Sequence, residues 1–211
     1  MNEAGARVDV ESLQLSAEHC MALCHALPRA GDLESAMRLV ESVRHSLLGP
    51  GLLTVNVDVT GTGIGIGTGS GKSGESDAPG SVALERVWSS NPAAYPVAGR
   101  KRKRLTPWTQ QLLRRAEIFI GEGEAALAQV FDDHAVIAGL GLRSVVNVPL
   151  LDDTGRCFAT FNALGPRSHW LLREVLALQL LAALATPAVR RATSSVLQVM
   201  SPLPCGPSTN T

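Results

Sequence analysis

The sequence predicts an α+β fold with a central antiparallel sheet of about five or six strands. Helical spacing of apolar residues marks both ends of the chain, and alternating strand patterns with turn residues lie between them. In this arrangement the N- and C-terminal helices cover one face of the sheet and a helical crossover covers the other. The chain has 211 residues, 45% of them hydrophobic, which suits one well-buried core and is short for two.

Two amphipathic helices are expected before the first strand. In residues 12–27 apolar side chains recur at intervals of three and four, which is the spacing of one helix face. Pro28 and Gly31 interrupt this pattern. Asp32 is the predicted N-cap of the second helix, and Gly49 followed by Pro50 ends it.

Strand patterns follow in two groups. Residues 52–59 alternate Val with Thr, Asn and Asp, which predicts a half-buried strand, and residues 82–89 resume the sheet. The intervening segment 61–80 is rich in Gly and Ser and predicts a flexible hairpin insertion. Two later strands, 145–151 and 156–164, flank a turn at residues 152–155.

The crossover is predicted to begin with a polar loop up to residue 105. A helix follows at 107–116, because Thr106 can act as its cap and Pro107 suits the first helical position. We then expect a short strand at 117–120 and short helices at 124–131 and 133–140. The last helix is expected at 169–185, with Pro187 at or beyond its end.

Residues 12–190 are therefore expected to form a single domain. Residues 1–11 are polar and mixed, and residues after 201 carry Pro, Gly, Ser and Thr with little apolar content. Such segments cannot bury enough apolar surface to offset the entropy of ordering, so 1–11 and 191–211 are predicted to be disordered tails.

Overall charge and cysteine usage exclude several classes of protein. The chain carries 19 basic and 19 acidic residues, so no net field draws it to nucleic acid or an anionic membrane. No uninterrupted apolar run reaches the ~18 residues of a membrane helix. The four cysteines and the absence of a signal-like N-terminal segment fit a reducing cytoplasm.

Two motif-like clusters lack the context that their chemistry needs. Residues 69–74 read Gly-Ser-Gly-Lys-Ser-Gly, but no helix start follows them to bring a dipole to a phosphate. Cys20 and Cys24, flanked by His19 and His25, lack the second, distant ligand pair of a structural zinc site. Core cysteines explain the second cluster better, so no metal site is predicted.

Polar and aromatic residues punctuate the stretch 88–164 in an unusual order. It contains Ser90-Asn91-Pro92-Ala93-Ala94-Tyr95-Pro96, then Thr106-Pro107-Trp108, Phe131-Asp132-Asp133-His134 and Asn147-Val148-Pro149. That order resembles the GAF domain family, and within it a group of compact, mostly single-domain bacterial members. The resemblance covers about residues 30–190. It implies a GAF/PAS-like sheet whose crossover covers a pocket for a small molecule.

The resemblance and the residues together predict the lining of this pocket. Tyr95 and Trp108 are expected as aromatic walls, and Lys101 as the inward cation of the basic run 100–104, with Arg102 and Arg104 facing water. Hydrogen bonds are expected from the side chains of Asp133, His134, Asn147 and Asn162.

Asn147 and Asn162 stand within apolar strand patterns. A buried amide must find partners, and these two can either pair with each other or form the polar floor of a cavity.

These patterns leave two functions open. The first is a sensory or regulatory module that encloses a small polar or anionic ligand and signals through a partner. The second is a small enzyme or haem protein in which His134 ligates iron or acts as acid or base on a small nitrogenous or carboxylic metabolite. The sequence does not determine a cofactor: haem belongs to the second function, and the first names none. A homodimer is expected through the terminal helices, because leucines cover more than one face of the last helix.

Overall fold

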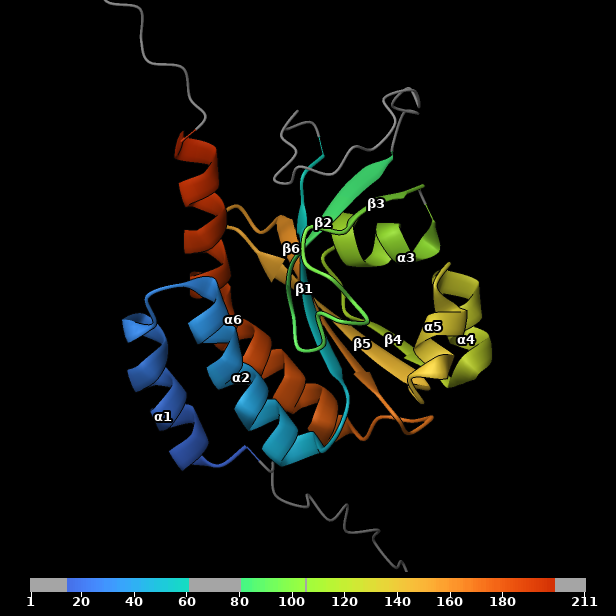
Figure 1. Cartoon of the computed structure of the whole chain (residues 1–211), viewed down its shortest axis with the longest axis horizontal. Helices are drawn as coiled ribbons and strands as arrows, with labels where there is room; N and C mark the ends of the chain where they lie inside the picture. The colour runs from blue at the N-terminus through green and yellow to red at the C-terminus, as the bar shows by residue number, and fades with distance from the viewer. Residues whose placement is uncertain (1–14, 61–80, 105, 200–211) are drawn as a thin grey trace, which may run out of the picture.

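The computed structural model describes residues 15–60, 81–104 and 106–199 (Figure 1). The side chains of Arg100, Lys101 and residues 195–199 are not described. The predictions for the tail 1–11, the insertion 61–80 and residues 200–211 lie outside these ranges.

The expected α+β fold is confirmed. Six strands form one sheet in the order β3-β2-β1-β6-β5-β4, and each neighbouring pair is antiparallel. The strands are β1 (Leu52–Asp58), β2 (Val82–Ser89), β3 (Arg100–Lys103), β4 (Phe119–Glu122), β5 (Ser144–Leu151) and β6 (Cys157–Gly165). In the centre, β1 pairs with β6 and β6 with β5, so residues 52–58 and 144–165 lie side by side (Figure 1).

The third strand corrects the sequence prediction, which placed a polar loop at 100–103. Four consecutive basic residues form β3 and pair with β2, with Lys103 opposite Val82. Such a segment has low intrinsic strand propensity. It lies at an edge of the sheet, where lysine and arginine hinder pairing with another chain, and tertiary pairing overrides its propensity.

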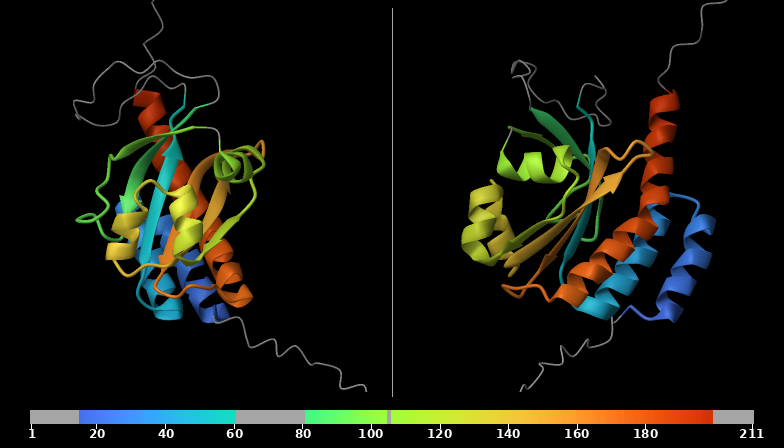
Figure 2. Two further views of the ribbon diagram at one scale, coloured as in Figure 1. Left: turned by 90° about the vertical axis from the view of Figure 1, so that its right-hand side faces the viewer. Right: turned by 180° about the vertical axis from the view of Figure 1, so that it is seen from behind.

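Helices α2 (Leu33–Leu48) and α6 (Leu172–Val199) cover one face of the sheet, and α1 (Ala17–Ala26) packs against α2 on the side away from the sheet (Figure 2). A short 3₁₀ turn, Leu27–Arg29, separates α1 from α2. The predicted cap is confirmed, because the Asp32 carboxylate accepts a 2.7 Å hydrogen bond from the Ser35 amide. Between these helices and the sheet lies the larger core, which includes Met37, Val40, Leu53, Phe161, Leu178 and Leu181.

The last helix is longer than predicted. α6 continues through Pro187 to Val199, so residues 191–199 belong to it and the predicted end at 185 was wrong. A proline inside a helix removes one backbone hydrogen bond. Ala188 and Val189, directly after it, are buried in the core, and this packing offsets the lost bond.

α6 is the one segment of the described chain that is long and apolar enough to cross a membrane, over Leu172–Ser194. Half of that window is buried inside the fold, and the helix packs on α2 and on β5. Both observations fit the core helix of a globular domain.

The crossover covers the opposite face with short helices (Figures 1 and 2). They are α3 (Pro107–Thr109), a π-helical turn (Gln110–Arg114), α4 (Gly123–Val130) and α5 (His134–Gly139). Thr106 caps α3 as predicted, in a reciprocal capping box with Thr109. The predicted helix at 107–116 is thus one α turn followed by one π turn.

Apolar side chains on the crossover face form two separate clusters. One centres on Leu52, Tyr95, Ile137 and Val145. The other, which centres on Leu84, Trp108 and Leu112, lies nearer to β3. The side chains between the two clusters are mostly polar, and this is where the candidate site lies.

Candidate functional site

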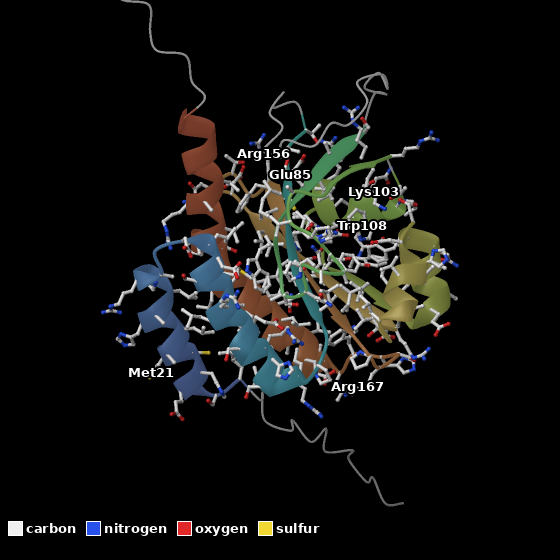
Figure 3. The ribbon with its side chains drawn as sticks, in the orientation of Figure 1. Met21, Glu85, Lys103, Trp108, Arg156 and Arg167 are labelled. Atoms are coloured by element: carbon white, nitrogen blue, oxygen red, sulfur yellow. The ribbon has the colours of Figure 1, made fainter. Side chains whose placement is uncertain are left out.

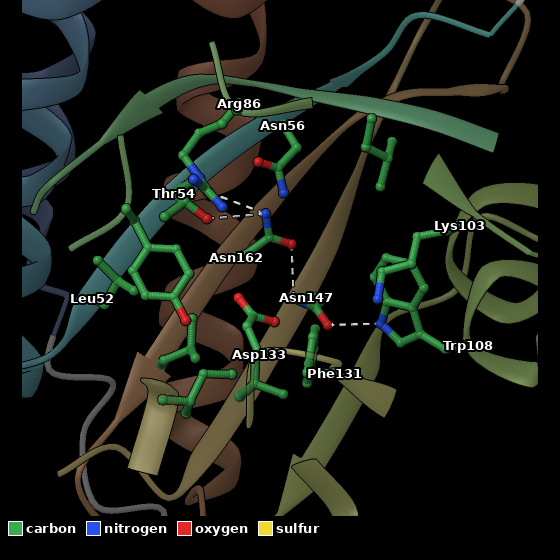
Figure 4. A pocket seen from close by; sticks show the side chains of 16 residues that line it. Leu52, Thr54, Asn56, Arg86, Lys103, Trp108, Phe131, Asp133, Asn147 and Asn162 are labelled. Carbon is green, nitrogen blue, oxygen red and sulfur yellow. Dashed lines mark hydrogen bonds between the residues drawn. The ribbon is translucent and has the colours of Figure 1, made fainter. Parts of the chain in front are cut away.

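A cavity of about 60 Å³ lies between the sheet and the crossover (Figure 4). Its polar lining consists of Thr54, Asn56, Arg86, Tyr95, Lys103, Trp108, Asp133, Asn147 and Asn162. Its apolar walls include Leu52, Leu84, Phe131, Ile137, Val145 and Leu164. The volume is well below the roughly 300–1,000 Å³ of sites for drug-sized ligands. The cavity therefore suits a small molecule.

A row of polar side chains on three adjacent strands forms the floor. Asn147 on β5 lies directly opposite Asn162 on β6, which lies opposite Thr54 on β1. Asn147 Nδ2 donates a 2.7 Å hydrogen bond to Asn162 Oδ1, and Asn162 Nδ2 reaches the hydroxyl groups of Thr160 and Thr54 at 3.1 and 3.4 Å. The two amides thus both pair with each other and line the cavity.

Trp108 fixes the direction of this chain of hydrogen bonds. Its Nε1 group donates a 3.0 Å bond to Asn147 Oδ1, and an indole nitrogen can only donate. The Asn147 amide must therefore turn its oxygen to Trp108 and its nitrogen to Asn162, which sets the orientation of Asn162 in turn. The capped first turn of α3 positions Trp108, and Phe131 packs edge-on against its ring at 6.1 Å.

Arg86 is a buried cation of the cavity that the sequence prediction missed. A bulge in the β1–β2 pairing places Val55 opposite Trp88 but Asn56 opposite Arg86, so Val87 is the extra residue. The bulge reverses the alternation of side chains along β2. Trp88 packs in the helix-side core, while Arg86 lines the cavity on the other face. A charged residue within an apolar strand pattern was the available signal.

Tyr95 holds the Arg86 guanidinium from the loop between β2 and β3. The guanidinium carbon lies 4.8 Å from the centroid of the Tyr95 ring, and Nη1 donates a 3.0 Å hydrogen bond to the Pro96 carbonyl. Gly99 lies so close that an added Cβ would sit 3.3 Å from Nη1. Arg86 is thus enclosed by its own neighbouring loop.

Burial perturbs both titratable groups of this pair. It lowers the pKa of Arg86, and the nearby Asp133 carboxylate partly counteracts that shift. Burial also raises the pKa of Tyr95, and Asp133 adds to the rise. Tyr95 is therefore a neutral hydroxyl at physiological pH and can donate a hydrogen bond.

Lys103, two residues after the predicted Lys101, lines the cavity with its side chain. The side chain of Lys101 lies outside the described part of the chain. Lys103 and Trp108 lie on the crossover side of the sheet, far from Met21 on α1 (Figure 3). Lys103 Nζ donates a 3.0 Å hydrogen bond to Asp132, whose side chain is largely exposed. Arg102 and Arg104 are exposed, as expected.

His134 does not reach the cavity, so the expectation that it points inward was wrong. It is the first residue of α5, its side chain is exposed, and its Nδ1 group lies 3.1 Å from the Phe131 carbonyl. The preceding residue, Asp133, lines the cavity instead. Successive residues at a helix start point about 100° apart around the axis, which separates these two side chains.

The cavity does not fit a haem. No His, Cys or Met is among the described residues that line it, and these are the commonest axial ligands of haem iron. Within the described ranges no group of three or more His, Cys, Asp or Glu side chains could hold a metal ion. Cys157 is buried and forms a hydrogen bond to the Ala159 carbonyl.

Comparison with known proteins agrees with this architecture. The GAF domain model matches residues 34–189, which is most of the chain. The chain belongs to the GAF domain family. No curated protein matches it.

Solved GAF domains share the fold at low sequence identity. The GAF domain of a phosphoenolpyruvate-protein phosphotransferase from Coxiella burnetii is 14% identical, with a TM-score of 0.56 over 85% of this chain and 95% of that one. The corresponding Acinetobacter domain is 12% identical, with a TM-score of 0.54 over 88% and 98%. The chromophore-binding domain of the R. palustris bacteriophytochrome RpBphP3 is 12% identical, with a TM-score of 0.52 over 84% and 62%.

Proposed function

We propose that this GAF domain is a sensory or regulatory module that binds a small polar or anionic molecule in the cavity between its sheet and crossover. The observation that carries this proposal is the ordered floor of the cavity, in which Trp108, Asn147 and Asn162 form a directed chain of hydrogen bonds. Polar groups that are buried and already oriented bind a ligand without a large cost in reorganisation. They also favour a ligand with complementary polar groups.

The charges of the lining support a polar ligand over an apolar one. Arg86 and Lys103 contribute two buried cations, and Asp133 contributes a carboxylate. A purely apolar ligand would leave these groups without water and without new partners, which costs free energy. The small volume excludes chromophores of tetrapyrrole size from the cavity in this conformation.

Signalling from such a module requires a second surface, for which α6 is the best candidate. Leu172, Leu176 and Leu180 are 74%, 41% and 42% exposed and follow one another at four-residue intervals, so they share one helix face. We infer that this leucine stripe forms a homodimer in a soluble cytoplasmic protein, so that a ligand can change how two copies pack.

Ligand retention during purification tests the proposal. Val145 lines the cavity and is fully buried, so Val145→Phe should fill part of the space, at a stability cost of about 1–3 kcal/mol. Val136→Phe is the matched control, because Val136 is 49% exposed on α5. Mass spectrometry of extracts should find a metabolite bound to the wild type and to the control, and depleted in Val145→Phe. Equal retention in all three would place the ligand outside the cavity.

A further inference from the structure

Two buried donor groups of the cavity make no hydrogen bond of good geometry in the described part of the chain, although the Asp133 carboxylate lies close enough to Tyr95 to raise its pKa. They are Nε of Arg86 and the hydroxyl of Tyr95. Both residues are only 7% exposed, and both line the cavity. A buried donor without a partner destabilises the protein, so a ligand group that accepts from both donors would recover that free energy.

The polar side chains of the cavity floor, in contrast, already form hydrogen bonds with one another. Trp108 donates to Asn147, Asn147 to Asn162, and Asn162 to oxygens of Thr54 and Thr160. The polar groups of the floor already bond to one another, so they need no ligand as a partner. The donors that a ligand can still satisfy belong to Arg86 and Tyr95. The ligand group that complements these two donors is an acceptor, which would share this side of the cavity with the Asp133 carboxylate.

The chemistry of the two donors favours a carboxylate as this acceptor. The planar guanidinium fork of arginine matches the two oxygens of a carboxylate, and the neutral Tyr95 hydroxyl adds a further donor. The nearby Asp133 carboxylate interacts with both Arg86 and Tyr95, so it would repel a doubly charged anion more strongly than a singly charged one. The rest of the ligand would meet the apolar walls at Phe131, Ile137 and Val145.

From this arrangement we propose that the cavity binds a short-chain monocarboxylate, held at its carboxylate by Arg86 and Tyr95, with its hydrocarbon part against the apolar walls. The inference rests on the proposed ligand-binding function and narrows it to one chemical class. Arg86 and Tyr95 are then binding residues that determine specificity, and the Pro96 carbonyl and the Tyr95 ring hold the Arg86 guanidinium in place.

Titration with propionate, monitored by NMR, tests this assignment. The indole of Trp108 and the side-chain amides of Asn147 and Asn162 report on the cavity. Propionate should give saturable shifts in the wild type. Propionamide, which is neutral, and sulfate, which carries two negative charges, should each bind at least about tenfold more weakly. Equal binding of propionamide would overturn the assignment, and so would equal binding of sulfate.

Three variants test the residues. Tyr95→Phe removes only the hydroxyl, and Arg86→Lys keeps the charge but loses the fork; each should weaken propionate binding about tenfold or more. Arg102→Lys, at an exposed arginine of the same basic surface, should bind as the wild type does. If the folded Tyr95→Phe and Arg86→Lys variants both keep wild-type affinity, the assignment of these residues is wrong.

The same titration separates this inference from the broader function. If a neutral metabolite shifts the cavity resonances and no monocarboxylate does, the inference fails and the ligand-binding function stands. If no metabolite of a cell extract shifts them, both fail.

Discussion

The side-chain amides of Asn147 and Asn162 face each other on neighbouring strands and share a 2.7 Å hydrogen bond beneath the cavity. Both side chains are at least 95% buried, so neither can exchange this bond for one to bulk water. Trp108 adds a donor to one end of the pair and Thr160 an acceptor to the other. The four side chains therefore act as a unit, and stability should depend on them non-additively.

We expect Asn147→Ala and Asn162→Ala each to lower the free energy of unfolding by about 1–3 kcal/mol, because each leaves a buried polar partner unsatisfied. The double variant should lose less than the sum, with a coupling energy of about 0.5–3 kcal/mol. Urea unfolding followed by tryptophan fluorescence measures these differences. Asn56→Ala, on the same face of β1 but only half-buried, is the control and should cost less. Strict additivity of the two single changes would contradict a shared network.

Tyr95 should resist ionisation in the folded protein. It is the single tyrosine of the chain, so the phenolate absorbance reports on this residue alone. Burial raises its pKa above the ordinary value of 10.0. The phenol proton is thus held more tightly in the folded state. The contribution of this group to the free energy of unfolding is fully present below about pH 10 and is lost as the pH rises further.

An alkaline titration of the native protein should therefore show phenolate only as the protein unfolds, while Tyr95→Phe should lose less stability above pH 10. A phenolate signal that appears near pH 10 in a protein with native circular dichroism would show that the hydroxyl is accessible to water.

The leucine stripe of α6 should mediate self-association. Leu176→Lys combined with Leu180→Lys places two charges on the exposed face, where like charges from two copies repel each other. We expect the wild type to scatter light as twice the 22.2 kDa chain and the double variant as a monomer. Val136→Lys, at an exposed position on α5, should remain dimeric. A monomeric wild type at high concentration would refute the proposed interface.

The cysteines should differ in reactivity. Burial raises the pKa of Cys157 to about 12, so almost no thiolate forms at mildly alkaline pH, whereas Cys24 is exposed on α1. Alkylation followed by peptide mapping should label Cys24 in the native protein and Cys157 only after denaturation. Cys24→Ser should remove the label from that peptide and leave Cys157 unlabelled in the native protein. Native labelling of Cys157 at the rate of Cys24 would mean that β6 opens locally on the timescale of the reaction.

The sequence by itself determined the order of the elements except β3, because caps, turns and apolar periodicity are local properties. Residues within a few positions of each other predict the Asp32 cap and the start of α3 behind Thr106. They also predict which neighbours lie on the same strand face as Asn147 and Asn162. Strand alternation alone placed Asn147 beside Val145, and Asn162 beside Leu164, and all four side chains line the cavity.

Only the tertiary structure decided which other side chains enter the site. The bulge opposite Val55 and Asn56 turns Arg86 toward the cavity and Trp88 away from it, and a one-residue change in register reverses every side chain that follows. Likewise, pairing with β2 made a strand of four basic residues, and core packing carried α6 past Pro187. Each of these outcomes depends on contacts between segments far apart in the chain, whose free energy outweighs the local preference of the residues involved.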